Sequence, residues 1–367
     1  MRLAILSHSA RLYAEIARHE GFEVLAIDAF ADADTRQSAH AVWQLPALGG
    51  QLMQAEVDAL LKALDKWQPD GLLIGSGFEA NIECYGQLHQ RYHVLGNAPA
   101  VMQQVKQPVW LQAYCEAHGV LSPEIRLQAP LQGKWLYKQT GQCGGSHVRD
   151  WPEADDASSS DGYWQVSQTG QPVGALFIAD QQTIILIGVH ALKQRPGKYT
   201  YAGAARLHEM ALIQAMQNLL QTLVPDSGLV GINSLDAIWH NGQLHVLEIN
   251  PRLSASMRLY ADLPLIQAHI ASCQHNTMPA FQLNSKHASH CIAYARQAIK
   301  DAQLDFPDWV EDRPNGHAAI AAGQPVCSLY AEGHSDSEVR QALQHKKTQL
   351  EKLWGTYVCE HIEFNIH

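Results

Sequence analysis

The chain has 367 residues, of which 46% are hydrophobic and 17% charged, and its formal net charge is -10 at pH 7. A chain of this size can bury a large core and is expected to divide into about two to four units. The negative charge, with no basic run, disfavours nucleic acid and anionic membranes as partners. Because no apolar run reaches roughly 18 residues and no charged-then-apolar leader is present, we expect a cytoplasmic protein.

The first part of the chain predicts a doubly wound domain. Residues 2–28 show the pattern of a buried strand, a helix and a second strand. A dehydrogenase, with Asp28 contacting a ribose, is excluded because residues 7–12 contain no glycine and cannot form a G-x-G-x-x-G loop. Residues 72–79 form another strand that enters a glycine-containing turn. These two turns either line a substrate crevice or are plain connecting loops.

The next segment carries a lysine on a strand, followed by a glycine-rich loop. Lys106 stands just before a helix predicted over residues 108–118, and Lys138 lies on a strand predicted over residues 135–139. The loop 141–146, with three glycines, follows. Such a loop holds phosphates through backbone N–H groups and the lysine charge, although a tight hairpin would need the same glycines. It is not a P-loop, because no Gly-Lys-Ser/Thr ends it.

The middle of the chain is predicted to alternate strands and loops before a long helix. Its acidic, serine-rich stretch from 151 to 162 is expected to be a mobile loop. Three basic side chains in this part either meet a phosphate or carboxylate or are solvated surface charges: Arg195, Lys198 and Arg206. The expected elements are strands at 163–166, 173–179 and 184–190, a loop at 195–205 and a helix at 206–223.

A β-hairpin is predicted where residues 228–239 and 243–250 meet around a short turn. Side chains alternate faces along a strand, so Glu248 and Asn250 share one face. If the turn is a three-residue loop with Gly242 in the left-handed conformation, Trp239 pairs with Gln243. Asp236 then lies on the face of Glu248, as its diagonal neighbour at about 7 to 8 Å.

A two-residue Asn-Gly turn leads to the opposite expectation. It pairs His240 with Gln243 and places Asp236 on the other face of the hairpin. Asp236 and Glu248 can therefore share a site only if the loop has three residues.

Asp236, Glu248 and Asn250 together would offer only oxygen ligands, which suits Mg²⁺. Arg252 follows with a planar fork for phosphate or carboxylate. An isolated Glu-x-Asn is usually a solvent-facing pair, so the interpretation depends on the other motifs in the chain.

Those motifs together resemble the ATP-grasp superfamily, whose late hairpin carries an acid and then E-x-N-P-R for two Mg²⁺ ions and ATP. The spacing of twelve from Asp236 to Glu248 is similar to that of family members, and the resemblance covers most of the chain. The segments around Ala10, Ala29 and residues 76–79 resemble a biotin-carboxylase-related branch of carboxylate-amine ligases. That branch includes tyramine-glutamate ligases and proteins linked to tetrahydromethanopterin-dependent one-carbon metabolism.

The resemblance implies an α/β fold: the ATP-grasp fold with an N-terminal Rossmann-like (pre-ATP-grasp) domain, a glycine-loop lid and a C-terminal α+β module. The implied boundaries are 1–100 for the first domain, 101–195 for the lid, 196–284 for the catalytic subdomain and 285–367 for the closing module. In the closing module we expect strands at 291–295 and 323–331 and a helix at 335–354.

The resemblance also assigns roles to individual residues. Asp236, Glu248 and Asn250 would hold Mg²⁺, or Mn²⁺ in its place, and Arg252 and Lys138 would act in catalysis. ATP would be bound by Lys106, Lys138, Gly144, Gly145, Ser146, Gln165 and Val166. Gln165 and Val166 fall where the adenine edge meets backbone amides, and the commoner pattern has a glutamate near that point.

The implied activity is an ATP- and Mg²⁺-dependent ligation of a small carboxylic acid to an amine through an acyl phosphate, with a homodimer as an expected assembly. One alternative is a carboxylase similar to biotin carboxylase or aminoimidazole carboxylase. Another is an ATP-binding protein without catalysis.

Overall fold

The computed structural model describes residues 1–151, 162–275, 278, 280, 285–300, 304–315 and 319–355. Most of the acidic, serine-rich segment expected to be mobile lies outside these residues. Within them, no helix is both long enough and apolar enough to cross a membrane.

A parallel five-stranded sheet opens the chain, in the order β3-β2-β1-β4-β5. The predicted strand, helix and strand are confirmed as β1, α1 and β2. The strands are apolar on both faces because helices cover both sides of the sheet. This unit contains β1 (Arg2–Leu6), α1 (Arg11–His19), β2 (Glu23–Asp28), α2 (Ala33–Ser38), β3 (Ala41–Gln44), η1 (Pro46–Gly49), α3 (Gln54–Trp67), β4 (Gly71–Ile74), α4 (Ile82–Arg91) and β5 (Val94–Leu95).

The order of these strands fixes where a ligand can bind. β1 is the central strand, and the chain leaves it in one direction to β2 and in the other to β4. The turns after β1 and β4 therefore meet at the carboxyl edge, which is the usual ligand crevice of such sheets.

Two short helices lead from this unit into a four-stranded antiparallel sheet in the order β6-β9-β7-β8. Its small core is aromatic, formed by Trp135, Tyr137 and Trp164. We call this sheet and its loop the lid. The elements are α5 (Pro99–Val105), α6 (Pro108–Ala117), β6 (Ile125–Arg126), β7 (Trp135–Gln139), β8 (Val148–Trp151) and β9 (Gly162–Val166).

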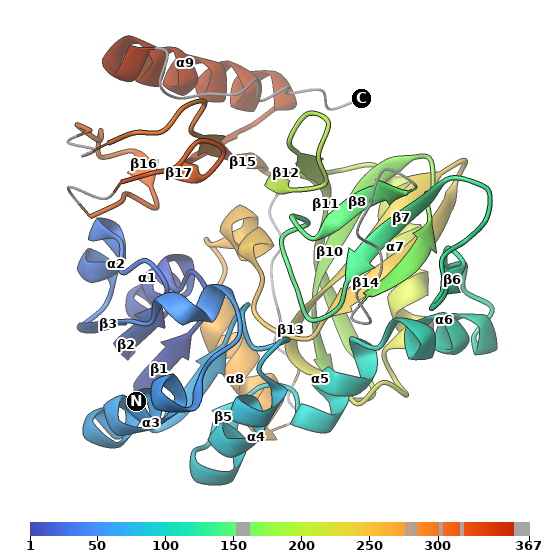
Figure 1. Cartoon of the computed structure of the whole chain (residues 1–367), viewed down its shortest axis with the longest axis horizontal. Coiled ribbons are helices and arrows are strands. Elements are labelled where there is room, and N and C mark those ends of the chain that lie inside the picture. The colour runs from blue at the N-terminus through green and yellow to red at the C-terminus, as the bar shows by residue number, and fades with distance from the viewer. Residues whose placement is uncertain are drawn as a thin grey trace.

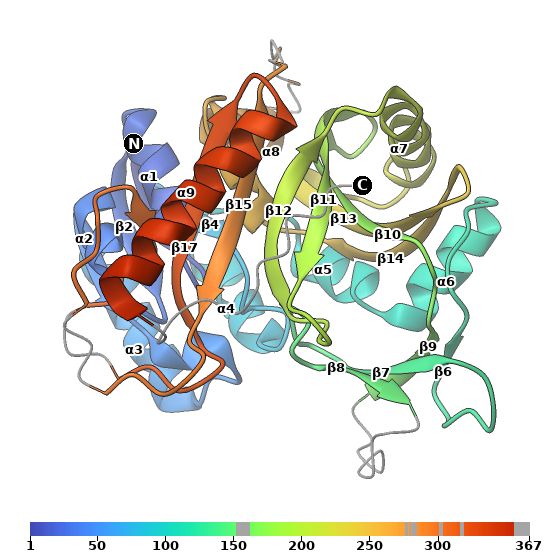
Figure 2. The same cartoon turned by 90° about the horizontal axis from the view of Figure 1, so that it is seen from above.

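An eight-stranded antiparallel sheet forms the centre of the molecule, in the order β14-β13-β10-β11-β12-β15-β17-β16. The N-terminal unit lies on the left of Figure 1, with the central sheet and the lid on the right, and α9 lies over β15 and β17 (Figure 2). Its elements are β10 (Gln171–Asp180), β11 (Ile184–Gln194), β12 (Tyr201–Leu207), α7 (Met210–Leu223), β13 (Val230–His240), β14 (Gln243–Asn250), η2 (Ala255–Tyr260), α8 (Leu265–His275), β15 (His287–Tyr294), β16 (Val310–Glu311), β17 (Pro325–Gly333) and α9 (Asp336–Trp354).

The central sheet buries both faces. Along β10, Val173, Ala175 and Phe177 pack with α6 and α7, whereas Leu176 and Ile178 pack with α1 and α8. The core that contains Leu176 and Ile178 also contains residues of β1 and α1, so it joins the N-terminal unit to the central sheet.

The prediction of a loop over residues 195–205 is wrong for its second half, which is strand β12, and α7 begins at Met210 rather than at residue 206. The sequence of this strand is rich in alanine and glycine, which have low strand propensity. Pairing with β11 and β15 overrides that propensity. Gly203 is needed there, because a Cβ would lie 2.2 Å from the carbonyl oxygen of His290.

The predicted strands and helix of the C-terminal module are confirmed as β15, β17 and α9. Ser335 caps α9 by accepting a hydrogen bond from the amide of Glu338. Strands from both sides of the predicted boundaries at residues 195 and 284 belong to the central sheet, because β12 pairs with β11 and with β15. The division into four parts stays a prediction.

Candidate active site

The turn of the β13–β14 hairpin differs from the one expected. His240 pairs with Gln243, so the loop has two residues, and the predicted three-residue loop is wrong. Asn241 and Gly242 both have positive φ, 48° and 77°, which is the backbone of a type I′ turn. The left-handed conformation predicted for Gly242 is confirmed.

A β-bulge in β14 shifts the pairing by one residue, as a three-residue turn would have done. Ala237 pairs with Val246, but the next pair is Asp236 with Glu248, so Leu247 is an extra residue in β14. Asp236 therefore lies directly opposite Glu248, rather than diagonally. The amide nitrogen of Asn250 lies 3.4 Å from Asp236 Oδ2 and 3.5 Å from Glu248 Oε1, so the three side chains share one face as predicted.

Lys106 reaches this face from the carboxyl end of α5. Its ammonium lies 3.0 Å from Glu248 Oε2 and 3.1 Å from Asn250 Oδ1, and 18% of its side chain is exposed. The side chain of Glu248 is 41% exposed, so it lies on the open side of the site. A positive charge thus sits between two oxygens that the sequence proposes as metal ligands.

Arg252 makes a buried ion pair that the sequence did not predict. Its Nε lies 2.5 Å from Glu79 Oε1, and the side chain of Glu79 is only 2% exposed. The other oxygen of Glu79 accepts the amide of Gly77 in the turn after β4. Arg252 Nη2 also approaches Asn250 Oδ1 at 3.5 Å. The signal for Glu79 was its place in a glycine turn at the carboxyl edge of a predicted parallel strand.

Asn97 fixes the hairpin against the first unit. Its amide donates to Asn233 Oδ1 at 2.7 Å and to the carbonyl of Pro251 at 2.9 Å, while its oxygen accepts the amide of Val230 at 2.8 Å. All three bonds are buried or nearly so, and together they hold the start of β13 and the residue before Arg252.

The carboxylates of the hairpin have opposite electrostatic environments. Burial and the neighbouring carboxylate of Glu248 raise the pKa of Asp236 to about 8. Partial burial would raise the pKa of Glu248 too, but the ammonium groups of Lys106 and Lys138 outweigh this effect and lower that pKa. Burial lowers the pKa of Lys138 itself, with Glu248 acting against this effect.

The lid presents Lys138, Tyr163 and Gln165 on one face, because Lys138 pairs with Tyr163 two residues from the pair of Leu136 with Gln165. Gln165 is 1% exposed, and its side-chain oxygen has no hydrogen-bond partner among the described residues. The amide of Val166 already donates to the carbonyl of Glu124. The side chain of Gln165, rather than the backbone N–H of Val166, is therefore the unused group at this position.

The glycine-rich loop contacts the start of β12 and the residues just before that strand. Gly144 and Gly145 have φ of 74° and 76°, and the carbonyl of Gly144 accepts the amide of Tyr201. A Cβ on Gly145 would lie 2.0 Å from the carbonyl oxygen of Tyr199. Ser146 is exposed. The thiol of Cys143, which the sequence did not single out, has a pKa raised by burial and by Glu79.

The structure uses two of the basic residues in the middle of the chain for other contacts. Arg206 donates to the carbonyls of Leu259 and Lys286 and lies over the ring of Tyr260. Arg195 donates to the carbonyl of Gly323. Lys198 is exposed. None of these contacts joins the hairpin site.

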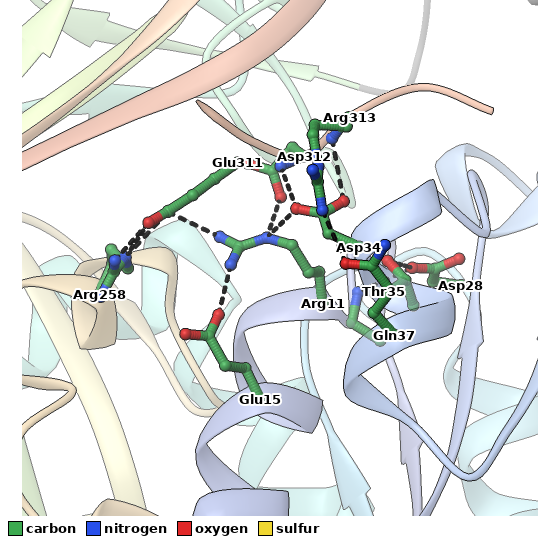
Figure 3. Close-up of polar contacts among 11 residues, drawn as sticks. Arg11, Glu15, Asp28, Asp34, Thr35, Gln37, Arg258, Glu311, Asp312 and Arg313 are labelled. Carbon is green, nitrogen blue, oxygen red and sulfur yellow. Dashed lines mark hydrogen bonds and ion pairs between the residues drawn. The ribbon is translucent and has the colours of Figure 1, made fainter. Parts of the chain in front are cut away.

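The closing module is tied to α1 by a network of charges around Arg11 (Figure 3). The Arg11 guanidinium, 4% exposed, contacts Asp312 at 2.6 Å, Glu15 at 2.7 Å and Glu311 at 3.1 Å. Arg258, just beyond the β13–β14 hairpin, also pairs with Glu311. The network therefore joins the N-terminal unit, the segment after the hairpin and the closing module.

A second unpredicted feature lies beside Asp236. His190, Gly174 and Asp236 are neighbours across three strands. A Cβ on Gly174 would lie 2.6 Å from His190 Nε2 and 3.3 Å from Asp236 Oδ1. The glycine thus leaves room for both side chains, which no sequence motif indicated.

Comparison with known proteins adds a family to this geometry. Residues 104–256 match a family model described as the ATP-grasp domain. Comparison with curated protein sequences gives no match.

Solved structures share the fold at low sequence identity. Pyruvate carboxylase from Rhizobium etli has a TM-score of 0.71 and 14% identity over 94% of this chain, which spans only 36% of that chain. The biotin carboxylase domain of 2-oxoglutarate carboxylase from Hydrogenobacter thermophilus, a dimer with MgADP and bicarbonate, has a TM-score of 0.69 and 10% identity, covering 94% of this chain and 88% of that one.

An L-amino acid ligase from Bacillus licheniformis has a TM-score of 0.69 and 12% identity, covering 96% of this chain and 97% of that one. The domain match covers the lid and the hairpin, and the fold match covers nearly the whole chain. Residues 104–256 of this chain therefore match the ATP-grasp domain, and nearly the whole chain shares the fold of these solved structures.

Proposed function

We propose that this chain is an ATP- and Mg²⁺-dependent ligase that joins a carboxylic acid to an amine through an acyl phosphate. The observation that carries the proposal is the convergence of Lys106, Asp236, Glu248, Asn250 and Arg252 on one end of one hairpin. Residues 142 positions apart meet there, which a merely solvent-facing Glu-x-Asn pair would not require.

The donors at this site fit Mg²⁺. Two carboxylates and an amide offer only oxygen, which is the ligand type that Mg²⁺ prefers. The ammonium of Lys106 between Glu248 and Asn250 shows that these oxygens already stabilise a cation. Mg²⁺ held there would neutralise phosphate charge during transfer.

The lid fits a nucleotide. Lys106 and Lys138 bring two positive charges to the side of Glu248, which suits a polyphosphate. The unpartnered oxygen of Gln165 is a buried acceptor that an amino group, such as that of adenine, would satisfy. The consecutive glycines 144 and 145, both with positive φ, carry no side chains, which suits a loop whose backbone N–H groups contact phosphates.

In the proposed reaction a carboxylate oxygen attacks the γ-phosphorus of ATP, the bond to the β,γ-bridging oxygen breaks, and ADP leaves with the electron pair. The neutral amine then attacks the acyl carbon, phosphate leaves with the electron pair of its C–O bond, and the nitrogen loses one proton to water or phosphate. Arg252 would hold the acid and the acyl phosphate by charge-assisted hydrogen bonds. Glu79 orients the Arg252 fork.

Hydroxylamine tests the first step without knowledge of the natural amine, because it converts an acyl phosphate into a coloured hydroxamate complex. We would incubate the protein with MgATP, hydroxylamine and single carboxylic acids, including L-glutamate and other amino acids. The proposal expects hydroxamate and ADP with at least one acid. Amines, including tyramine, would then replace hydroxylamine, so that the finer prediction of a tyramine-glutamate ligase is tested in the same panel.

A carboxylase is the second candidate, favoured by the fold shared with the bicarbonate-containing structure. It predicts bicarbonate-dependent phosphate release, stimulated by biotin or an aminoimidazole, and no hydroxamate from organic acids. MgATP binding without turnover under either condition would instead indicate a non-catalytic ATP-binding protein.

A further inference from the structure

His190 has a buried imidazole with one nitrogen left without a partner. The residue lies on β11 and is 1% exposed, and its Nδ1 makes no hydrogen bond within the described part of the chain. A proton on Nδ1 would be a buried N–H without an acceptor, which proteins rarely contain. We therefore assign the proton to Nε2. The ring is neutral, because burial lowers the pKa of His190 to about 3, with His290 acting in the same direction.

The Nε2 atom lies on the side of the ring that faces β10 and the carboxylate of Asp236. His190 pairs with Gly174 across one edge of β10, and Gly174 pairs with Asp236 across the other. A Cβ on Gly174 would lie 2.6 Å from His190 Nε2 and 3.3 Å from Asp236 Oδ1. Both atoms therefore border the position that a side chain at residue 174 would occupy.

Glycine at position 174 interrupts an otherwise apolar part of β10, in which Val173 and Ala175 are fully buried. A glycine inside a strand weakens it and often marks a place where another backbone or a ligand approaches closely. At Gly174 the nearest atoms belong to the side chains of His190 and Asp236 and not to a backbone. The glycine thus keeps space on this face of the sheet for two polar side chains.

The neighbours of His190 restrict the position of its ring. Its ring centroid lies 6.5 Å from that of Tyr260, whose hydroxyl donates to the carbonyl of Val189. Arg206 pairs with His190 across the other edge of β11 and is itself held by the carbonyl of Leu259. The ring is therefore packed between β10, β12 and the segment after the hairpin.

The strand order separates a phosphate side from the side of His190. The opposed residues on this face run in the order Glu248, Asp236, Gly174 and His190. Lys106 contacts Glu248 at 3.0 Å, so its charge lies at the end that suits a polyphosphate. In phosphoryl transfer the attacking and leaving oxygens lie roughly in line on opposite sides of the phosphorus. The attacking acid therefore belongs on the other side of Asp236, toward His190.

We propose that the Nε2–H of His190 donates a hydrogen bond to a carboxylate oxygen of the acid substrate, beside Asp236 and away from Lys106. The inference rests on the proposed function and makes β11 part of the acid site. A neutral N–H donor complements a carboxylate oxygen. The same oxygen becomes the carbonyl oxygen of the acyl phosphate and gains negative charge when the amine attacks, so the hydrogen bond assists both steps while His190 keeps its proton.

The substitution His190→Leu removes the donor and keeps an apolar side chain in its place. We expect kcat/KM for the acid in the hydroxamate assay to fall by about tenfold or more, as for loss of one hydrogen bond to a charged group. The Kd for MgATP without acid should stay within about twofold, and the unfolding temperature should be unchanged or higher, because a buried unpaired nitrogen is lost. If bicarbonate is the acid, phosphate release replaces the hydroxamate readout.

His190→Gln tests the donor itself, since its amide nitrogen can take the place of Nε2 and should recover part of the lost kcat/KM. Binding of the acid gives a readout without turnover. Calorimetric titration of the acid that yields hydroxamate, in the presence of Mg²⁺ and a non-hydrolysable ATP analogue, should show a similar loss of affinity in His190→Leu and a smaller one in His190→Gln.

His269→Gln is the matched control, because both ring nitrogens of that buried histidine bond to backbone, at Ile232 and Leu95. It should lower the unfolding temperature and leave the kinetics of the folded enzyme for the acid unchanged. Wild-type kinetics and acid affinity in His190→Leu would overturn the inference and leave the ligase proposal intact. Equal losses of stability and MgATP affinity in both His190 variants would show a structural role and also overturn it. Absence of acid-dependent turnover in the wild-type protein would count against the proposed function itself.

Discussion

Asp236 faces Glu248 directly across the β13–β14 hairpin, and the extra residue Leu247 brings the two carboxylates to that register. The pair is close enough that each carboxylate affects the other, and the pKa of Asp236 rises to about 8 through burial and the charge of Glu248. Lys106 offsets only part of this charge, from the side of Glu248. This charge arrangement supports the proposed Mg²⁺ site between the two strands.

Glu248→Gln should reduce ATP-dependent turnover by about two orders of magnitude or more, because one well-placed electrostatic contact in such a site is worth roughly 3 kcal/mol. Glutamine keeps an oxygen donor and nearly the same volume, so the unfolding temperature should change little. Glu124→Gln, at an exposed position near the lid, is the control and should change neither quantity. Unchanged turnover and MgATP affinity in Glu248→Gln would contradict the metal site.

Asn97→Ala should destabilise the protein by about 2 to 4 kcal/mol, because it removes three hydrogen bonds and leaves buried groups of the hairpin unpaired. Denaturant unfolding would measure the change. Asn218→Ala on the exposed face of α7 loses one surface bond to Gln214 and should cost well under about 1 kcal/mol. Equal effects of the two substitutions would mean that Asn97 does not join the units.

Gly145→Ala should impair turnover more than Gly144→Ala. Both glycines have positive φ, so both variants carry similar backbone strain, of order 1 kcal/mol. Only at Gly145 would the added Cβ meet backbone, at 2.0 Å from the Tyr199 carbonyl, whereas nothing lies within 4 Å at Gly144. The Kd for MgATP and the turnover rate, measured for both variants, test whether the contact with Tyr199 fixes the conformation of the loop. Mobility of this loop without nucleotide stays a prediction.

Acid should destabilise the folded protein through protonation of His269 in the unfolded state. Its Nδ1 accepts the amide of Ile232 and its Nε2 donates to the carbonyl of Leu95, so the folded state needs the neutral ring. Burial lowers its pKa from 6.5 to about 4. The unfolded state therefore binds a proton first, and the stabilisation is complete above pH 6.5 and lost as the pH falls from 6.5 to about 4.

His269→Gln should thus be less stable than the wild type at pH 7.5, by about 1 to 2 kcal/mol for weakened buried bonds, and the difference should shrink and then change sign as the pH falls toward 4. Denaturant titrations at several pH values would measure it. His345→Gln on the exposed side of α9 controls for loss of a histidine. A difference that stays constant with pH would show that His269 does not titrate between the two states.

The sequence predicted the elements whose local pattern is strong. The alternation and apolar runs of β1, β2, β10 and β13 reflect buried strands, and the helix near Ser335 is marked by its cap. The Ala-Gly run of β12 was missed because its strand conformation comes from its neighbours in the sheet.

By itself, the sequence determined the residue types of the hairpin site and the face shared by Glu248 and Asn250, since side chains alternate along any strand. Tertiary structure decided the register that places Asp236 opposite Glu248, because a bulge depends on how the whole strand packs against the core. It also brought Glu79 to Arg252 and Lys106 to Glu248. Those contacts join residues far apart in the chain, and only the packing of one unit on another determines which of them meet.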